Sequence, residues 1–385
     1  MSVFAALLGQ ESVVAELAAV AARSDAALRG EAGSGMTHAW LFTGPPGSGR
    51  SNAARAFAAA LQCVDGGCDH CGSCRTVALG THADVLLVRP SLMSVGVNDT
   101  RELVRRAALA PSGRRWQVVI VEDADRLTDH AVNALLKAIE EPAPHTVWLL
   151  CAPTPEDMLP TVRSRCRHVR LRTPPLDAIA AVLRQEGVAA ALADAAAHAS
   201  QGHIGRARWL ATDEEARGRR DDVLQIPVQL RSLDACLDAA SRLVAAADAD
   251  ARAATEDVDA SETEEMRRAL GFGTEGRSPR QTEGVLKDLD SRQKKRAKRQ
   301  QRDALDRAML DLVAFYRDVL ARQLGAAVPL VNSETDDRVE AVAKAGPPES
   351  SLRRIDAILA CREALDANAG TSLAVESMML ALRAG

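Results

Sequence analysis

The sequence predicts an α/β domain built on a parallel sheet, followed by a small helical domain and a larger all-helical one. The main observation is a series of short, continuous apolar segments separated by stretches of helical periodicity; these segments lie at 39–42, 85–88, 118–121 and 147–151. Strands buried on both faces have this pattern, and the intervening helices make the sheet parallel. After Pro174-Pro175 the sequence is helical in character. With 385 residues and 47% hydrophobic residues, two or three domains with sizeable cores are expected.

Each element follows from its local pattern. The sheet domain is expected over residues 1–172, with helices at 51–61, 99–109 and 129–140. A small helical domain is expected over 173–212, where an Ala-rich helical pattern is broken by Gly187 and Gly202.

The remaining residues, 213–385, form helices by periodicity, and their apolar stripes are expected to be core. Acidic residues at 248–265 precede a Gly/Ser/Pro-bearing stretch at 271–280 and a basic run at 292–299. We therefore expect a flexible insert at about 250–300, with 271–280 as a mobile linker. The basic run has two interpretations, a solvated helix face or contact with DNA phosphates.

Composition narrows the function classes. The net charge of -4 gives no nucleic-acid footprint for the whole chain, so contact with DNA requires a local patch or a larger assembly. No basic residue precedes the apolar run Phe4 to Leu8, so a signal peptide is not expected, and no stretch approaches the ~20 apolar residues of a membrane span. Eight Cys, four of them clustered, fit a reducing compartment. We expect a cytoplasmic protein with no membrane partner.

A phosphate-binding loop joins the first strand to the first long helix. Glycines at 44, 47 and 49 allow positive φ, which brings backbone N–H groups toward phosphate oxygens. Ser51 is placed to hold Mg²⁺, but Arg50 stands where this chemistry uses Lys, and its planar fork alters the geometry. We expect weak or static binding of ATP or ADP with Mg²⁺, with a working ATPase and an empty loop as alternatives. The loop residues are Gly44, Pro45, Pro46, Gly47, Ser48, Gly49, Arg50 and Ser51.

Two acids follow the strand at 118–121. Glu122 and Asp123 stand where an ATPase places one carboxylate on Mg²⁺ and another on the attacking water. In the order Glu-Asp, Glu122 reaches further than an Asp would at the Mg²⁺ position, and Asp123 falls short of the attacking water. We expect this order to weaken catalysis. The alternative is a pair of solvated acids at a strand end.

Four cysteines, Cys63, Cys68, Cys71 and Cys74, lie within twelve residues in a segment rich in turn formers. Four thiolates at this spacing can close a tetrahedral Zn²⁺ site with no open position, so the expected role is structural. An iron–sulfur cluster and unmetallated thiols are the alternatives. His70 is expected to be a bystander.

A third group of residues follows the strand at 147–151. The Thr154 hydroxyl can sense a γ-phosphate there, while Arg163 and Arg165 end a short helical turn at the surface. An Arg at a domain edge can stabilise transition-state charge in a neighbouring site. Spacing alone favours a surface salt bridge.

These motifs together give the chain a resemblance that spans nearly its whole length. It resembles the clamp-loader branch of the AAA+ ATPases, and within that branch the delta-prime type of subunit of bacterial DNA polymerase III. The matching segments are Gly9-Gln10, His38-Ala39-Trp40-Leu41-Phe42, the loop at 44–51, the four-Cys module, Glu122-Asp123-Ala124-Asp125, Asn133-Ala134-Leu135-Leu136-Lys137-Ala138-Ile139-Glu140-Glu141-Pro142, Ser164-Arg165-Cys166 and Asn368-Ala369-Gly370.

The resemblance implies an AAA+ domain with a zinc module at 63–74, a lid domain and an all-helical collar domain for oligomerisation. It implies that Arg165 acts as an arginine finger in trans, in the ATP site of an adjacent subunit, and that Arg206 matches the second sensor of the lid. The helix beginning near Asn98 to Arg101 resembles the region by which clamp loaders follow the template backbone.

The same resemblance implies partners: tau/gamma and delta subunits, the sliding clamp, and primer-template DNA through the assembled complex. Arg50 and the order Glu122-Asp123 depart from the pattern of the ATP-hydrolysing tau/gamma motor, which is the alternative function. The spacing from Cys63 to Cys68 is shorter than the family's usual one. A third alternative is a zinc-stabilised scaffold that binds no nucleotide.

Overall fold

The computed structural model describes residues 2–28, 36–88, 97–113, 115–269 and 279–385. The chain divides into two compact units, Met1–Arg208 and Trp209–Gly385. Each unit is described by itself.

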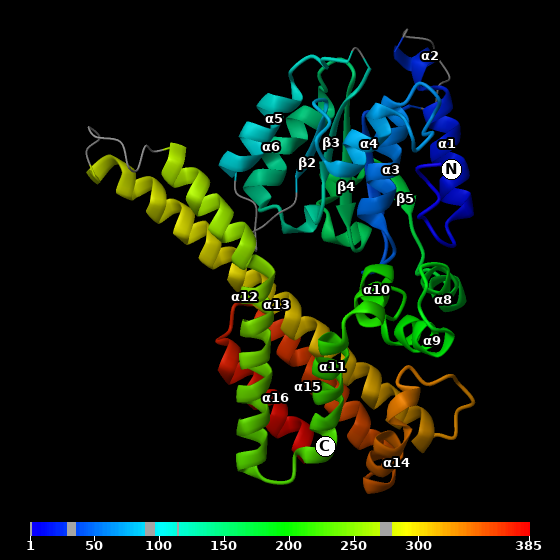
Figure 1. Ribbon diagram of the computed structural model, residues 1–385, viewed down its shortest axis with the longest axis vertical. Coiled ribbons are helices and arrows are strands. Elements are labelled where there is room, and N and C mark those ends of the chain that lie inside the picture. Colours follow the sequence, from blue (N-terminus) through cyan, green and yellow to red (C-terminus); the bar gives the residue numbers. More distant parts are fainter. Residues whose placement is uncertain (1, 29–35, 89–96, 114, 270–278) are drawn as a thin grey trace. The chain divides into compact units, whose positions relative to one another are not determined.

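A five-stranded parallel sheet forms the centre of the first unit (Figure 1). Its order is β2-β3-β4-β1-β5, and every neighbouring pair is parallel. The predicted α/β class with a parallel sheet is therefore confirmed. The strands are β1 (Ala39–Thr43), β2 (Val85–Val88), β3 (Gln117–Val121), β4 (Thr146–Ala152) and β5 (Arg167–Arg170).

Alternate side chains of the strands enter two separate cores. Trp40 and Ile120 pack with α1 (Glu11–Ala22) and α3 (Arg50–Gln62) on one face. Leu41, Val119 and Trp148 pack with α6 (Asp129–Glu140) on the other. Because strand side chains alternate between faces, burial on both sides requires the continuous apolar runs seen in the sequence.

Shorter elements complete the first unit. The helix expected at 99–109 is α5, at Val97–Ala107. Three helices occupy the expected small helical segment, and Gly187 and Gly202 both adopt φ +92° between them. The other elements are α2 (Ser24–Leu28), α4 (Gly72–Leu79), the 3₁₀ turns η1 (Ala124–Arg126) and η2 (Pro155–Asp157), α7 (Pro160–Arg163), α8 (Leu176–Gln185), α9 (Ala190–Ala199) and α10 (Ile204–Thr212).

In its described residues the second unit is helical. The predicted stripes are buried, with Leu305, Leu312 and Phe315 meeting Val375 and Met379 in one core. The elements are α11 (Glu214–Gln229), α12 (Leu233–Ala269), α13 (Pro279–Gln323), the 3₁₀ turn η3 (Ser333–Thr335), α14 (Asp336–Ala345), α15 (Pro348–Asp366) and α16 (Thr371–Ala384).

The range 250–300, where a flexible insert was expected, is helical over 250–269 and 279–300. Helices α12 and α13 extend beyond the other helices of the unit as a two-helix arm (Figure 1). Arg296 explains why the charged stretches are ordered, because it pairs with Asp259 at 2.7 Å and with Glu262 at 2.8 Å. The linker expected at 271–280 falls almost entirely outside the described residues. Across the described ranges, no helix combines the length and apolarity needed to cross a membrane.

Candidate nucleotide site and cysteine cluster

The phosphate-binding loop lies at the carboxyl edge of the sheet, between β1 and α3. The Gly44 N–H donates to the Pro153 carbonyl at 3.0 Å, which joins the loop to the end of β4. Gly44, Gly47 and Gly49 have φ of +158°, +85° and +89°. Ser48 is buried, and its hydroxyl has no hydrogen-bond partner among the described residues. This edge is the usual place for ligands in parallel sheets.

A residue of the lid segment covers the loop. A Cβ added to Gly47 would lie 2.5 Å from the Cα and Cβ of His203, so only glycine fits at this position. His203 accepts a hydrogen bond at Nδ1 from the backbone N–H of Arg206 at 3.2 Å, at the start of α10. The start of α10 therefore lies directly over the loop.

Arg50 does not extend away from the loop. Its Nη1 donates a hydrogen bond to the carbonyl of Gly44, the first residue of the same loop. A guanidinium bound to this carbonyl is turned back on the loop itself, whereas a Lys ammonium in this position would be free to meet phosphate oxygens.

The two acids at the end of β3 are in different environments. Glu122 is 14% exposed, and its Oε1 lies 3.6 Å from Nε of Arg55 on α3. Asp123 adopts φ 49° and ψ 52°, and its Oδ2 lies 3.8 Å from Nε of Arg126. The charges of Glu122, Arg50, Asp123 and Arg55 all act on the wholly buried Cys151 at the end of β4. The loop and both acids therefore lie near one point of the sheet edge.

Asp125 was missed as a site residue. Burial raises its pKa, the Asp123 charge raises it further, and Arg126 and Arg50 oppose this effect. Its Oδ1 is buried without a hydrogen-bond partner in the described part of the chain. The sequence placed Asp125 two residues past the expected pair, but its approach to Arg50 depends on the 3₁₀ turn η1.

Thr154 is occupied locally. Its hydroxyl and its backbone N–H both donate to Oδ2 of Asp157, at 2.9 and 2.8 Å, and so cap η2. Thr154 directly follows Pro153, whose carbonyl accepts the hydrogen bond from the N–H of Gly44. The side chain of Arg206 is half-buried at the start of α10.

Arg165 is exposed, with 41% of its side chain open to solvent. Its Nη2 lies 2.7 Å from Oε1 of Glu140, and its Nη1 donates to the Thr161 carbonyl at 2.9 Å. The surface salt bridge favoured by spacing alone is therefore present. These two contacts hold the guanidinium beside the last residue of α6, where the side chain is open to solvent.

The four cysteine sulfurs form one cluster. All four lie within 4.8 Å of one another, and both Cys68 and Cys71 are 3.7 Å from Cys63, sulfur to sulfur. A disulfide requires about 2.05 Å. A tetrahedral site with Zn–S bonds of about 2.3 Å separates its sulfurs by about 3.8 Å. The geometry therefore fits a four-thiolate zinc site, and it includes Cys63 despite the short spacing.

Local backbone groups favour the thiolate form of Cys63, whereas burial and the neighbouring sulfurs raise the pKa of Cys74. Burial opposes ionisation of Cys63, but N–H donors at Cys68, Gly67 and Asp65 outweigh it and lower its pKa to about 6. Cys71 caps the N-terminus of α4, and its sulfur accepts a hydrogen bond from the N–H of Cys74. His70 instead places Nδ1 2.8 Å from the Cys68 carbonyl, outside the sulfur cluster.

A shallow depression lies between α5 and α6. Its lining is polar and partly basic, and Arg101, whose contact with DNA was an expectation, is at its rim with an exposed side chain. The lining residues are Arg101, His130, Asn133, Ala134 and Lys137.

Comparison with known proteins agrees with the motifs. Residues 28–175 match a family model described as DNA polymerase III, delta subunit. A DNA polymerase III subunit gamma/tau of Mycobacterium tuberculosis is 38% identical over 194 residues, which cover 48% of this chain and 32% of that protein. A DNA polymerase III subunit delta' of Pseudomonas aeruginosa is 37% identical over 168 residues, 42% of this chain and 50% of that protein. The chain thus spans between a third and a half of these relatives.

Among solved structures, a DNA polymerase III gamma subunit-related protein from Thermotoga maritima aligns with 90% of this chain and 94% of its own, with a TM-score of 0.39 and 15% identity. Over the residues that the sequence matches cover, the chain is similar to clamp-loader subunits of DNA polymerase III of the gamma/tau and delta' types.

Proposed function

We propose that this chain is a delta-prime-type subunit of the DNA polymerase III clamp loader. It is a largely non-motor AAA+ subunit that helps to open the sliding clamp and load it onto primed DNA. It has no independent ATPase activity and supplies Arg165 in trans to the ATP site of a neighbouring subunit.

The observation that carries this proposal is the contact between Arg50 and the Gly44 carbonyl. Hydrolysis requires a cation on the β- and γ-phosphates and carboxylates that hold Mg²⁺ and water. Here the cation is bound within the loop, and Glu122 faces Arg55 at 3.6 Å. The proposed site at Gly44–Ser51, Glu122, Asp123, Thr154 and Arg206 therefore binds ATP or ADP weakly or statically.

The setting of Arg165 supports a role outside its own subunit. An exposed guanidinium held by Glu140 and the Thr161 carbonyl is pre-positioned, and exchange of one carboxylate partner for a phosphate needs no refolding. The opposing interpretation is a surface ion pair without function.

The second unit supports assembly as the collar. Leu352 and Leu359 lie seven residues apart on α15, as do Leu373 and Leu380 on α16, and all four are exposed at 38% or more. Residues seven apart lie on the same helix face. We propose that these faces meet tau/gamma and delta subunits, and that the sliding clamp and primer-template DNA are partners of the assembled complex. The rim residue Arg101 would contact the DNA backbone.

The cysteine cluster is proposed to hold a structural Zn²⁺ through Cys63, Cys68, Cys71 and Cys74. The 3.7 Å separations between sulfurs support this proposal. With four protein ligands the ion has no position for a substrate.

A second candidate function is the ATP-hydrolysing tau/gamma-like motor. It is favoured by the 38% identity to a gamma/tau subunit and by the glycine geometry of the loop. Steady-state ATP turnover by the purified chain separates the two proposals. Mg²⁺-dependent turnover that Arg50→Ala abolishes would establish the motor and exclude the non-motor subunit.

The trans role is tested in the reconstituted complex. Arg165→Ala is expected to lower DNA- and clamp-stimulated ATP turnover by about 10²-fold or more. Arg163→Ala is the matched control, because Arg163 is a similarly exposed arginine two residues away whose ion pair, with Glu156 at 3.6 Å, is equally superficial. Equal turnover in the two variants would remove the arginine-finger role.

A further inference from the structure

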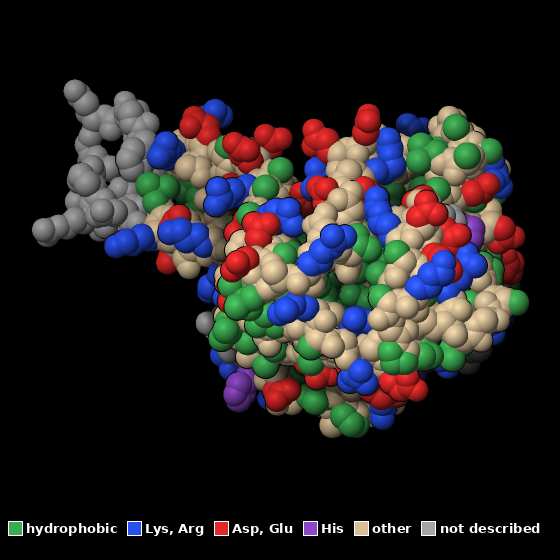
Figure 2. Space-filling view, turned by 90° about the horizontal axis from the view of Figure 1, so that it is seen from below, with side chains coloured by type: hydrophobic (Ala, Val, Ile, Leu, Met, Phe, Trp, Pro, Cys, Tyr) green, Lys and Arg blue, Asp and Glu red, His purple; other side chains and the backbone are tan. Residues whose placement is uncertain are grey.

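The arm formed by α12 and α13 carries a strongly cationic surface. Between residues 291 and 302 the sequence has seven Lys or Arg and no Asp or Glu. At 3.6 residues per turn, six of them fall within roughly half of the circumference of α13. Figure 2 shows Lys and Arg side chains, interspersed with Asp and Glu, along this arm beside its grey tip. We call these six the basic face of α13: Arg292, Lys294, Lys295, Lys298, Arg299 and Arg302. The first four are exposed, whereas the side chains of Arg299 and Arg302 are only 13% and 18% exposed.

The seventh residue, Arg296, lies at the edge of this face, about one turn after Arg292. Its side chain is 18% exposed and binds Asp259 and Glu262 of α12, so its charge is neutralised within the arm. The centre of the basic face lies about 120° around the helix from Arg296.

Half of the basic face has no acidic partner within the described chain. Three members pair with acids of the second unit: Lys294 with Asp290, Arg299 with Asp303, and Arg302 with Asp366. In the parts of the chain that the structure describes, Arg292, Lys295 and Lys298 form no ion pair. A solvated helix face usually mixes both signs, whereas a block of like charges repels itself unless a partner neutralises it.

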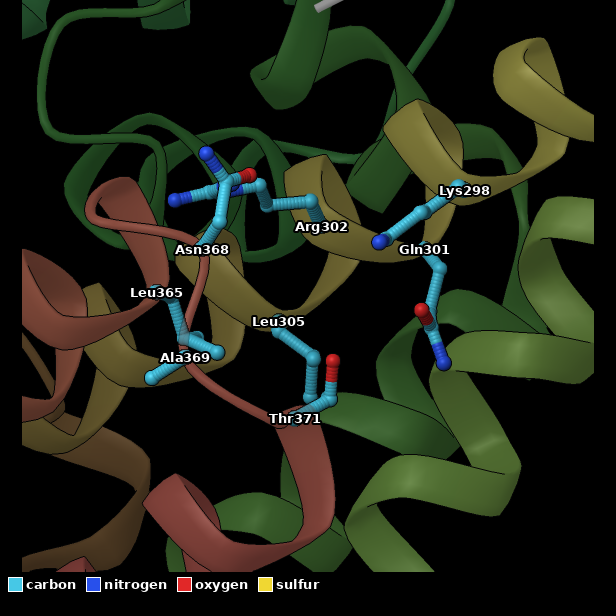
Figure 3. Close-up of a pocket in the computed structure, with 8 residues that line it drawn as sticks. All are labelled: Lys298, Gln301, Arg302, Leu305, Leu365, Asn368, Ala369 and Thr371. Carbon is cyan, nitrogen blue, oxygen red and sulfur yellow. The ribbon is translucent and has the colours of Figure 1, made fainter.

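The basic face ends at a small cavity of about 20 Å³. Lys298 and Arg302 line it together with Leu305 of the same helix and Thr371 at the start of α16. Figure 3 shows Arg302 reaching toward Asn368, with Lys298 one turn away. No lining residue is acidic, and the space is about that of one water molecule or phosphate oxygen.

We propose that the basic face of α13 binds the phosphate backbone of duplex DNA. The exposed members, at 292–298, extend for about 9 Å along the helix, which matches about three phosphates of one strand at 3.4 Å each. Backbone contact fits this surface because it contains no aromatic residue for base stacking. The choice of DNA over other phosphate polymers rests on the proposed function.

The alternative ligand is an acidic polypeptide. An amphipathic helix docks through apolar anchors at helical spacing, and the basic face has none between residues 291 and 302, where the single apolar residue, Ala297, lies outside it. Phosphate contacts need no apolar anchor. The surface therefore favours nucleic acid.

Fluorescence anisotropy with the purified full chain and a labelled 20-base-pair duplex tests this proposal over a series of salt concentrations. The variant is Arg292→Gln/Lys295→Gln/Lys298→Gln. The control, Arg252→Gln/Arg267→Gln/Lys344→Gln, removes the same charge from other exposed positions of the second unit. Circular dichroism verifies that both are folded.

The first variant is expected to lose affinity by about tenfold, with the slope of log K against log salt smaller by about 2 to 3, while the control keeps the wild-type slope. An equal slope in variant and control overturns the proposal, as does the absence of DNA binding by the wild-type chain. Loss of binding to polyglutamate, with DNA binding unchanged, would assign an acidic polypeptide instead. If the variant and control bind the duplex alike while Arg165→Ala still lowers ATP turnover by the complex, the DNA contact of α13 is rejected and the proposed function is retained.

Discussion

Arg50 donates a hydrogen bond from Nη1 to the carbonyl of Gly44, six residues earlier in the same loop. Arg50, which stands where the loop of an ATP-hydrolysing subunit has Lys, thus also bonds back onto its own loop. A cation held in this way is not free to contact the β- and γ-phosphates. The presence of Arg in place of Lys and its contact with Gly44 therefore both weaken nucleotide binding.

Arg50→Lys is therefore expected to strengthen nucleotide binding. A Lys ammonium lacks the guanidinium that reaches back to the Gly44 carbonyl and is a compact charge for phosphate oxygens. A fluorescent ATP analogue should therefore bind several-fold to tenfold more tightly, about 1 kcal/mol. Turnover should stay low because Glu122 and Asp123 are unchanged. Arg75→Lys, on the exposed side of α4, should alter nothing. Weaker binding by Arg50→Lys would mean that Arg50 itself holds the phosphate.

The contact between Gly47 and His203 predicts that a side chain at position 47 lowers the unfolding free energy through a steric clash, in addition to the backbone strain. Gly47→Ala combines positive φ with a clash at 2.5 Å, whereas Gly187→Ala has φ +92° and open space around its Cβ. The backbone term alone costs about 1 kcal/mol, so Gly187→Ala should lose that amount of unfolding free energy and Gly47→Ala about 1–3 kcal/mol more. Tryptophan fluorescence during urea unfolding measures both.

The double variant Gly47→Ala/His203→Ala identifies the source of the larger loss. It should recover the steric part and leave the backbone part. Equal losses for Gly47→Ala and Gly187→Ala would show that His203 moves aside at no cost.

The sequence alone predicted those parts of the fold and of the site that depend on residues close together in the chain. The strands β1 to β4 follow from continuous apolar runs, and the sulfur cluster follows from four cysteines within twelve residues. Strand β5 was not predicted, because only Val169 of its four residues is buried and it is ordered by pairing with β1. The meeting of His203 with Gly47 joins segments more than 150 residues apart, and no local pattern specifies such an approach.

Removal of one cluster sulfur tests the zinc site. Cys68→Ser should reduce bound zinc from about one ion per chain to near zero, because a structural site requires all four ligands. Cys166→Ser is the matched control, since Cys166 is a free cysteine outside the cluster. Metal analysis after gel filtration gives the stoichiometry, and chelator should lower the melting temperature of wild type and Cys166→Ser only. Iron in place of zinc, or no metal in the wild type, contradicts the site.

The environment of Asp84 predicts that the stability of the first unit depends on pH. Burial alone would raise its pKa, but hydrogen bonds from Ser112 and Gly113 lower it below the ordinary value. A lowered pKa stabilises the fold above the unfolded value of about 4, and this contribution disappears as pH falls through the folded pKa. Asp84→Asn should thus be about 1–3 kcal/mol less stable at pH 7, with a difference that narrows below pH 4.

Hydrogen exchange at the N–H groups of Ser112 and Gly113 gives a local measurement of this effect. The neighbouring His82, whose pKa is lowered by burial, also gains charge on acidification, so His82→Gln is the control. A wild-type to Asp84→Asn difference that grows toward low pH would contradict the assignment.

Arg220 joins three segments of the second unit. It is 9% exposed on α11, and its Nε lies 3.2 Å from Asp311 of α13, while its Nη1 lies 2.5 Å from Glu334 of η3. Arg220→Ala removes this cation from two carboxylates, one of them only 6% exposed, and is expected to cost about 3–5 kcal/mol. Arg242→Ala, which breaks an exposed pair with Asp238, should cost less than about 1 kcal/mol.

The size of the Arg220 effect does not measure the net contribution of the ion pair, because most of it is the cost of a carboxylate left buried beside a vacant site. Arg220→Met/Asp311→Leu removes both charges and should recover most of the loss in urea unfolding. Arg220 also donates a hydrogen bond from Nη2 to Oδ1 of Asn332. If the double variant is as unstable as Arg220→Ala, the stabilisation comes instead from the contacts with Glu334 and Asn332, which hold the segment before α14 in place.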